Sequence, residues 1–302
     1  METNANSSEK KLITILVPAY NEHESLPHLY DRLVKLMDEQ CKYDFEILFV
    51  NDGSKDNTLE LIKFLRQKDP RINYVNLSRN YGKETAMAAG FDYVRGDALV
   101  IIDADLQDPP ELISEMIKYW EEGYDDVYAR RKSRKGESAL KKLTSWGFYR
   151  VLQSMTKIEI QKDTGDFRLL DRRCVEAMKQ LRESQRYTKG LYSWIGYNKK
   201  EILYDRDPRI AGKSKWNYRR LVNLSIDGIT SFTTSPLRWA AIIGILVSLA
   251  GFIYMLAIII KTLIFGVYVS GYASMMVIIL FLGGIQLIFL GLIRRIFGTC
   301  LL

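Results

Sequence analysis

Two aspartates separated by one residue directly follow an apolar run in the chain. Residues 100–102 are Val-Ile-Ile, which predicts a buried strand, and Asp103 and Asp105 come next with Ala104 between them. Alternate side chains of an extended chain share a face, so both carboxylates can point at one spot beyond the strand. Their oxygens suit a hard divalent cation that also holds phosphate oxygens, and the alternative is a solvated turn.

The residues after this pair predict the start of a helix. Asp108 fits the N-cap, Pro109 the first turn and Glu111 the capping-box position. We therefore assign Asp108 to capping rather than to catalysis. Asp103 and Asp105 have no such structural task.

Three earlier segments have the same organisation, an apolar strand pattern that ends in a polar cluster. The expected strands cover residues 12–19, 45–50 and 72–77, and a helix to about residue 39 follows the first of them. Strands that alternate with helices predict an α/β fold with a doubly wound, mostly parallel sheet. Ligands bind such sheets at the carboxyl edge, where these clusters lie.

The side chains in these clusters are of kinds that can bind a nucleotide. Glu22 and Asp52 can accept hydrogen bonds from a ribose or a base edge, and Arg79 and Lys83 can neutralise a pyrophosphate. Residues 51–58 also look like a turn and helix cap, which accounts for Ser54 or Asp56 rather than Asp52. The glycine patterns of dinucleotide-binding and P-loop proteins are absent.

The segment from residue 125 to residue 205 contains a run of basic residues. A fifth strand is expected at 125–129, followed by the charge run 130–137, which is either a solvated face or, as we favour, an anion-binding loop. Residues 138–153 predict an amphipathic helix against lipid. At 163–170 an acid follows a glycine turn, ahead of a helix containing 171–181. An edge strand is expected at 201–205.

The last third of the chain predicts membrane attachment. Residues 239–260 and 272–293 each hold about 20 uncharged, mostly apolar residues, the length that spans a bilayer. We expect a catalytic domain over 1–210, a juxtamembrane amphipathic region over 211–236 and a transmembrane hairpin over 237–302. Residues 216–232 fit an interfacial helix, although a helix packed on the domain fits nearly as well.

Charge placement predicts the orientation. The net charge is +7, and basic residues precede the first span and follow the second, which favours a cytoplasmic catalytic domain and cytoplasmic termini in a cell membrane. Lys261, in the short outer loop, is a weak exception. Nothing besides the basic balance suggests nucleic acid as a partner. No cleavable signal peptide is expected, and the three cysteines lack metal-ligand spacing and fit free thiols.

Taken together, the motifs resemble the family 2 glycosyltransferases with the GT-A fold. The resemblance is to the polyprenyl-phosphate branch, which includes dolichol-phosphate mannose synthase and the bacterial bactoprenol glucosyltransferases. The matching segments, in the family's order, are residues 17–22, 51–54, 78–83, 103–111 and 165–169. The Gln-x-x-Arg-Trp signature of processive polysaccharide synthases is absent, because Arg238-Trp239 lacks the Gln.

The resemblance assigns roles to particular residues. It implies nucleoside contacts and metal ligation around the first four strand ends, and Asp166 takes the position usually called the catalytic base. The nucleotide-sugar-binding residues would be Pro18, Tyr20, Glu22, Asp52, Arg79, Lys83, Asp103 and Ala104. The ligands of Mg²⁺ or Mn²⁺ would be Asp103, Asp105 and Gln107. Catalysis would involve Asp105, Arg130, Arg131 and Asp166, and phosphates of donor or lipid acceptor would meet Arg130, Arg131, Arg134, Arg209, Ser214 and Lys215.

These assignments predict an inverting transfer of one sugar from a nucleotide sugar to undecaprenyl or another polyprenyl phosphate, in a bacterial cell envelope. UDP-glucose is the first expectation, with UDP-N-acetylglucosamine and UDP-galactose next. The alternatives are a non-phosphate lipid or glycan acceptor, a nucleotide-sugar-binding scaffold without activity, and a structural membrane anchor. Gly283, Gly284 and Gly291 permit close helix contacts, and we expect a homo-oligomer.

Overall fold

The computed structural model describes residues 10–132, 164–182 and 188–205, together with isolated helical positions between 253 and 289. The predicted boundaries at 210 and 236, the helices at 138–153 and 216–232, and most of the two spans lie outside the described residues. Within the described part of the chain, no helix is long and apolar enough to cross a membrane.

A seven-stranded mixed sheet forms the centre of the domain, in the order β3-β2-β1-β4-β6-β5-β7. The first four strands are parallel where they pair, β6 runs antiparallel to both β4 and β5, and β7 is parallel to β5. The strands are β1 (Leu12–Ala19), β2 (Asp44–Asn51), β3 (Ile72–Asn76), β4 (Ala98–Ile101), β5 (Asp126–Arg131), β6 (Thr164–Asp171) and β7 (Lys199–Tyr204).

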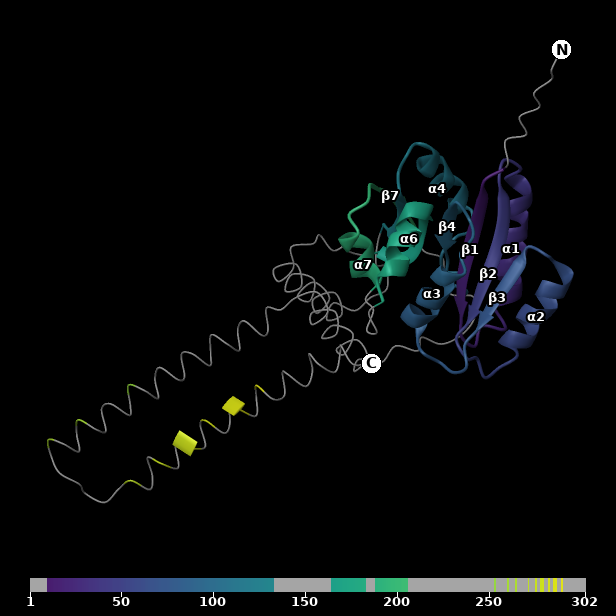
Figure 1. Ribbon diagram of the computed structural model, residues 1–302. Coiled ribbons are helices and arrows are strands. Elements are labelled where there is room, and N and C mark those ends of the chain that lie inside the picture. Colours follow the sequence, from purple (N-terminus) through teal and green to yellow (C-terminus); the bar gives the residue numbers. More distant parts are fainter. Residues whose placement is uncertain are drawn as a thin grey trace, which may run out of the picture.

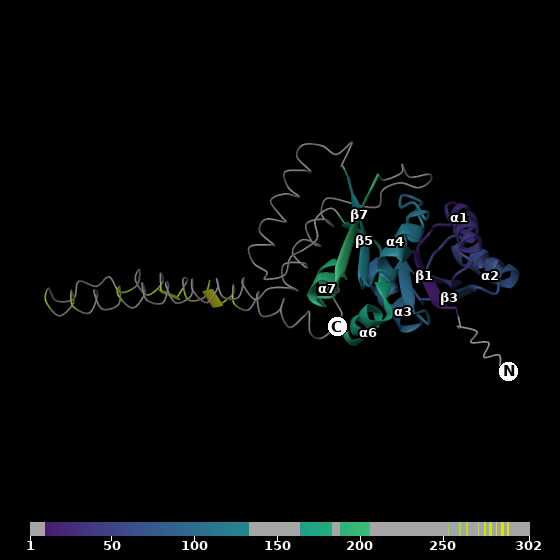
Figure 2. The same ribbon diagram turned by 90° about the horizontal axis from the view of Figure 1, so that it is seen from above.

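Helices cover both faces of this sheet (Figures 1 and 2). One apolar core joins the sheet to α1, α2 and α4, and a second joins its other face to α3, α6 and α7. The helices are α1 (Leu26–Glu39), α2 (Thr58–Lys68), α3 (Lys83–Asp92), α4 (Leu112–Glu121), α6 (Arg172–Gln180) and α7 (Thr188–Trp194). The predicted α/β class, six of the strands and the two-sided packing are confirmed.

The strand β6 was not predicted. From the sequence we expect an acid after a glycine turn at 163–170 and no strand, but Thr164–Asp171 is a strand with five consecutive buried residues, Asp166 to Leu170. It fills the gap between β4 and β5 and runs against both. The segment was missed because its charged residues, Asp166 and Arg168, are buried, so it lacks the apolar pattern that marks the other strands.

The helix after β4 also begins later than predicted. It starts at Leu112, and its N-cap position is Glu111, whose side chain makes no capping hydrogen bond and pairs with Arg32 instead. Asp108 lies four residues before the helix and accepts a hydrogen bond from the Tyr204 hydroxyl. The assignment of Asp108 to the N-cap was therefore wrong, because tertiary contacts override the local capping pattern.

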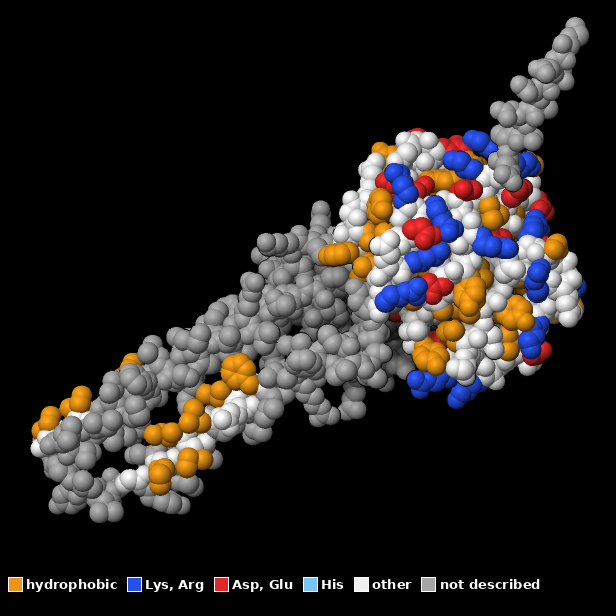
Figure 3. Space-filling view, in the orientation of Figure 1, with side chains coloured by type: hydrophobic (Ala, Val, Ile, Leu, Met, Phe, Trp, Pro, Cys, Tyr) orange, Lys and Arg blue, Asp and Glu red, His pale blue; other side chains and the backbone are white. Residues whose placement is uncertain are grey.

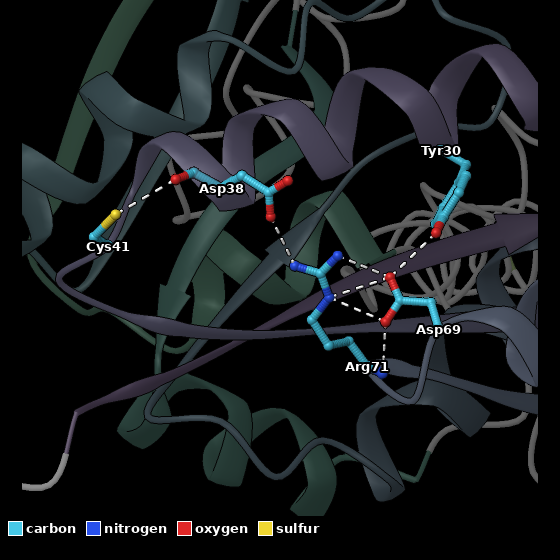
Figure 4. Close-up of polar contacts among 5 residues, drawn as sticks. All are labelled: Tyr30, Asp38, Cys41, Asp69 and Arg71. Atoms are coloured by element: carbon cyan, nitrogen blue, oxygen red, sulfur yellow. Dashed lines mark hydrogen bonds and ion pairs between the residues drawn. The ribbon is translucent and has the colours of Figure 1, made fainter.

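A polar cluster joins three elements at the edge where β3 begins (Figure 4). Arg71 donates to both carboxylate oxygens of Asp69, at 2.9–3.1 Å, and to Asp38 near the end of α1 at 3.1 Å. The Tyr30 hydroxyl also donates to Asp69, at 3.1 Å. Burial alone would raise the pKa of Asp69, but these donors outweigh it and hold the pKa below its ordinary value.

On the face shown in Figure 3, Lys and Arg side chains are interspersed with Asp and Glu side chains over the domain and cover more of it. Cys41 is exposed and Cys174 is buried, and both are free thiols as predicted. Cys300 lies outside the described residues.

The Asp69 cluster predicts a pH-dependent contribution to stability. Because the folded pKa is lowered, this contribution is fully present above the unfolded pKa of about 4 and is lost as pH falls through the folded value. We expect Asp69→Asn to lower the free energy of unfolding by about 1–3 kcal/mol at pH 7. Urea unfolding between pH 7 and pH 3 should show this deficit shrinking as the solution becomes more acidic. Glu60→Gln, in an exposed pair on α2, should change little at either pH.

A second prediction concerns the ion pair between Arg168 and Asp126, both fully buried, at 3.0 Å. Removing one partner leaves the other charge buried and unpaired, so Arg168→Met should cost about 3–5 kcal/mol of unfolding free energy. The matched control is Arg182→Met, which breaks an exposed pair with Asp92 and should cost less than about 1 kcal/mol. Equal losses from the two variants would contradict a structural role for the buried pair.

Candidate active site

The loops that follow β1 to β4 meet at one edge of the sheet, and β6 begins there. Ile101 of β4 pairs with Arg168 of β6. Asp103 lies two residues after Ile101, just beyond the end of β4. Asp166 lies two residues before Arg168, in β6. The antiparallel pairing therefore brings together a predicted metal ligand and the predicted base.

Lys83 joins these two carboxylates directly. Its ammonium lies 2.5 Å from Asp103 Oδ1 and 2.5 Å from Asp166 Oδ2. Burial alone would lower the pKa of Lys83, but the two carboxylates outweigh it and raise the pKa well above its ordinary value. We had predicted that Lys83 would meet a pyrophosphate, and no sequence pattern indicated this bridge.

The same contacts change the acidity of Asp166. Burial would raise its pKa, but the Lys83 ammonium and then Lys189 outweigh burial and hold the pKa far below the ordinary value. Its Oδ1 atom is buried and has no hydrogen-bond partner among the described residues. Asp166 is thus an ionised carboxylate with one oxygen left over for another group.

Asp52 organises the loop that leads to Lys83. Its carboxylate accepts hydrogen bonds from the backbone N–H of Tyr81 at 2.7 Å, that of Gly82 at 2.9 Å, and the Asn80 amide at 2.8 Å. Burial raises the pKa of Asp52 despite these donors. The structure gives Asp52 this anchoring task, and its contact with a nucleoside stays a prediction.

Gly53 lets the second and third loops approach each other closely. Its φ is +62°, and a Cβ there would lie only 2.3 Å from the carbonyl carbon of Arg79. A larger residue would push away the backbone that leads through Asn80 to Lys83. Arg79 itself is exposed, with its guanidinium 4.7 Å from the ring centroid of Tyr81.

The loop after β1 is tied to the loop after β2. Asn21, at φ 52°, donates through its backbone to Ser54 at 3.0 Å and accepts from the Lys55 N–H at 2.8 Å. Glu22 accepts from the Ser25 hydroxyl at 2.9 Å. Pro18, Tyr20 and Glu22, which were predicted to bind the nucleoside, are all half-buried at this edge.

The two predicted metal carboxylates differ in exposure. The Asp103 side chain is 26% exposed, whereas Asp105 is buried and accepts from the Gln107 N–H at 3.2 Å. Leu106, between Asp105 and Gln107, is in the left-handed region at φ 60°, which shapes the turn. Ala104 is buried beneath the loop.

These residues fit a divalent ion that shares its ligands with a substrate. Asp103, Asp105 and Gln107 supply oxygen donors, and such sites usually leave several positions to phosphate oxygens and water. The described residues contain no cluster of three or more His, Cys, Asp or Glu side chains suited to a metal. Two carboxylates and one amide are compatible with a divalent ion that also binds oxygens of a substrate diphosphate.

The arginines at the end of β5 have partners within the domain. Arg130 lies 3.2 Å from Glu201 of β7, while Arg131 contacts the Tyr204 hydroxyl, which in turn donates to Asp108. The Nε atom of Arg131 is buried without a partner among the described residues. Arg134, Arg209, Ser214 and Lys215 lie outside the described residues, so their predicted roles stay predictions.

Four supporting residues were given no role in the sequence analysis, namely Glu84, Arg168, Thr188 and Lys189. Glu84 accepts from both the N–H and the hydroxyl of Thr188, joining α3 to α7. Lys189 donates to the Thr164 carbonyl at 3.0 Å, two residues before Asp166 in β6. Arg168 lay inside a recognised motif, but Thr188 and Lys189 had no local signal.

A glycine substitution tests the packing of the nucleotide loops. We expect Gly53→Ala to weaken binding of UDP at least tenfold, because the new Cβ displaces the Arg79 backbone. Gly123→Ala is the matched control, since Gly123 also has positive φ (+98°) but nothing within 4 Å of an added Cβ. Calorimetric titration with UDP and a thermal unfolding curve for each variant would measure both effects. Unchanged UDP affinity in Gly53→Ala would contradict the role assigned to this loop contact.

Comparisons with known proteins agree with the geometry. Residues 14–178 match the family described as Glycosyl transferase family 2. A protein of Synechocystis sp., named an uncharacterized glycosyltransferase, is 50% identical over 286 residues, covering 95% of this chain and 90% of that protein. The bactoprenol glucosyl transferase of Shigella phage SfX is 43% identical over 286 residues, covering 95% of this chain and 93% of that protein.

Among solved structures, mannosyl-3-phosphoglycerate synthase from Rubrobacter xylanophilus aligns with a TM-score of 0.50 at 17% identity, over 72% of this chain and 71% of that one. This likeness concerns the fold alone and supports a GT-A-like sheet. Together with the sequence matches, it confirms the resemblance drawn from the motifs. The chain is a member of the family 2 glycosyltransferases.

Proposed function

We propose that this glycosyltransferase moves a single sugar from a UDP-sugar, glucose first, to a polyprenyl phosphate at the cytoplasmic face of a bacterial membrane. The observation that carries the proposal is the convergence of Asp103 and Asp166 on the Lys83 ammonium at one sheet edge. The choice of acceptor and sugar is supported by the relatives named bactoprenol glucosyl transferase.

The donor would lie across the loops of β1 to β4. Pro18, Tyr20 and Glu22 line the nucleoside end, while Arg79 and Lys83 supply charge for the diphosphate. A Mg²⁺ or Mn²⁺ ion held by Asp103, Asp105 and Gln107 would stabilise the negative charge of the departing diphosphate. The residues of this chain then have to align the donor with the acceptor phosphate and screen their like charges.

Asp166 fits the task of orienting the acceptor. A phosphate monoester is already largely ionised near neutral pH, since its second pKa is about 6. The acceptor therefore needs little deprotonation, and a carboxylate whose pKa is held very low is a weak proton acceptor. Direct displacement by the acceptor would invert the anomeric centre, so that an α-linked donor gives a β-linked lipid product.

Membrane attachment through two spans belongs to the proposal as well. At isolated helical positions between 253 and 289, six large apolar side chains are between 49% and 67% exposed. Such side chains call for lipid or a protein partner. The acceptor phosphate would meet Arg131 and, by resemblance, Arg134, Arg209, Ser214 and Lys215. Homo-oligomer formation stays a prediction.

The reaction can be tested directly. Detergent-purified full-length protein would be incubated with Mn²⁺, undecaprenyl phosphate and a panel of UDP- and GDP-sugars, and the lipid products identified by mass spectrometry. A lipid carrying one hexose from one donor, UDP-glucose by expectation, would support the proposal. Nucleotide release without a lipid product would overturn the acceptor assignment, and inactivity with every donor would overturn the proposal of catalysis.

Two carboxylate variants test the residue roles. We expect Asp105→Asn and Asp166→Asn each to lower kcat/KM by roughly 10²–10⁴-fold, because they remove a metal ligand and the acceptor-orienting group. Asp92→Asn, which alters only an exposed pair with Arg182, should leave kcat/KM unchanged. Full turnover by Asp105→Asn with metal dependence intact would remove Asp105 from the metal site.

A further inference from the structure

Lys83 contacts two carboxylates that the proposed reaction uses for different tasks. Asp103 is a proposed metal ligand, and Asp166 is proposed to orient the acceptor, yet one ammonium lies 2.5 Å from each of them. The Lys83 side chain is 37% exposed, so it lies at the wall of the site rather than beneath it. A flexible four-carbon stem allows the ammonium to move without any change in the backbone.

The Lys83 ammonium competes with a divalent ion for Asp103, because it already lies against Oδ1 of this carboxylate. Oxygen ligands lie about 2.0–2.6 Å from Mg²⁺ or Ca²⁺, which is the space that the Lys83 ammonium takes up beside Asp103 Oδ1. Two cations at that oxygen would also repel each other strongly in a partly buried site. While the Lys83 ammonium lies beside Asp103, it therefore opposes the binding of a metal ion there.

A diphosphate offers the ammonium another position. Lys83 is the first residue of α3, directly after the loop of residues 78–82 that Asp52 anchors, and a helix of this length attracts anions at its N-terminus. Exposed Arg79 lies in the same loop. The charge of a diphosphate at this place can draw the Lys83 ammonium away from Asp103 and Asp166.

We propose that Lys83 is an internal cation that holds Asp103 and Asp166 until a nucleotide diphosphate displaces it, so that the divalent ion binds together with the nucleotide and not before it. This inference rests on the proposed function. The same movement releases Oδ2 of Asp166, whose Oδ1 already lacks a partner among the described residues, for contact with the acceptor. Donor binding thereby precedes full exposure of the acceptor-orienting carboxylate.

Lys189 allows Asp166 to remain ionised after this movement. Its ammonium donates to the Thr164 carbonyl at 3.0 Å and adds to the positive potential at Asp166, while Thr188 beside it is held by Glu84. Lys189 lies near Asp166 but does not pair with Asp103, so it is the appropriate comparison for Lys83. Both lysines place positive charge near Asp166, but only Lys83 contacts Asp103, the proposed metal ligand.

The test is binding of Mn²⁺ to full-length detergent-purified protein, read from the electron paramagnetic resonance signal of free Mn²⁺, with and without UDP. Without UDP, Lys83→Met should bind Mn²⁺ at least tenfold more tightly than the unaltered protein, and Lys83→Arg should stay close to it. With UDP this gain should disappear. Lys83→Gln carries the same expectation if Lys83→Met does not fold, which a thermal unfolding curve would show.

Two controls separate the possible failures. Lys189→Met should raise Mn²⁺ affinity without UDP less than threefold; a gain equal to that of Lys83→Met would show a general charge effect and overturn the inference. Unchanged or weaker Mn²⁺ binding by both Lys83→Met and Lys83→Gln would also overturn it. Asp103→Asn should weaken Mn²⁺ binding in the presence of UDP. If it does not, the metal assignment in the proposed function is wrong, independently of Lys83.

Discussion

The contact of one ammonium with two carboxylates is the interaction on which the rest of the site depends. Asp103 and Asp166 come from strands that run in opposite directions, and Lys83 comes from the start of a helix. Like charges placed this closely oppose each other's ionisation unless a cation lies between them. The site therefore needs positive charge at all times, from Lys83 in this structure and from a metal ion during the proposed reaction.

Such a site requires rigid support, and the surrounding structure supplies it from two directions. Beneath Asp166, the Arg168 guanidinium is held by buried Asp126 and lies 3.7 Å from the ring centroid of Tyr192. On the nucleotide side, Asp52 anchors the backbone before Lys83, and Gly53 permits the close approach of the two loops. Both supports hold the backbone in place and leave the side chains of Lys83 and Asp166 free to exchange partners.

In the proposed reaction, positioning and charge matter more than proton transfer. A phosphate acceptor is already anionic, and it must approach a donor that carries a diphosphate. Repulsion between these groups is the main obstacle, so a site rich in cations with one ionised, partly unsatisfied carboxylate suits the reaction. Lys83 and Lys189 both lower the pKa of Asp166, and Lys189 stays beside it when Lys83 moves in the proposed reaction. A sugar hydroxyl as acceptor would need a stronger base.

The elements whose residues have a local pattern could be predicted from the chain alone. Six of the seven strands and the polar ends of the first four follow from apolar runs and turn residues, and the alternation of strands with helices predicts that those four are parallel. Three features became known only from the folded structure: residues 164–171 form an antiparallel strand, Asp108 binds Tyr204, and Lys83 bridges Asp103 and Asp166. These features depend on register between distant segments and on buried charges that are paired only in the folded state, and neither leaves a periodic signal in the chain.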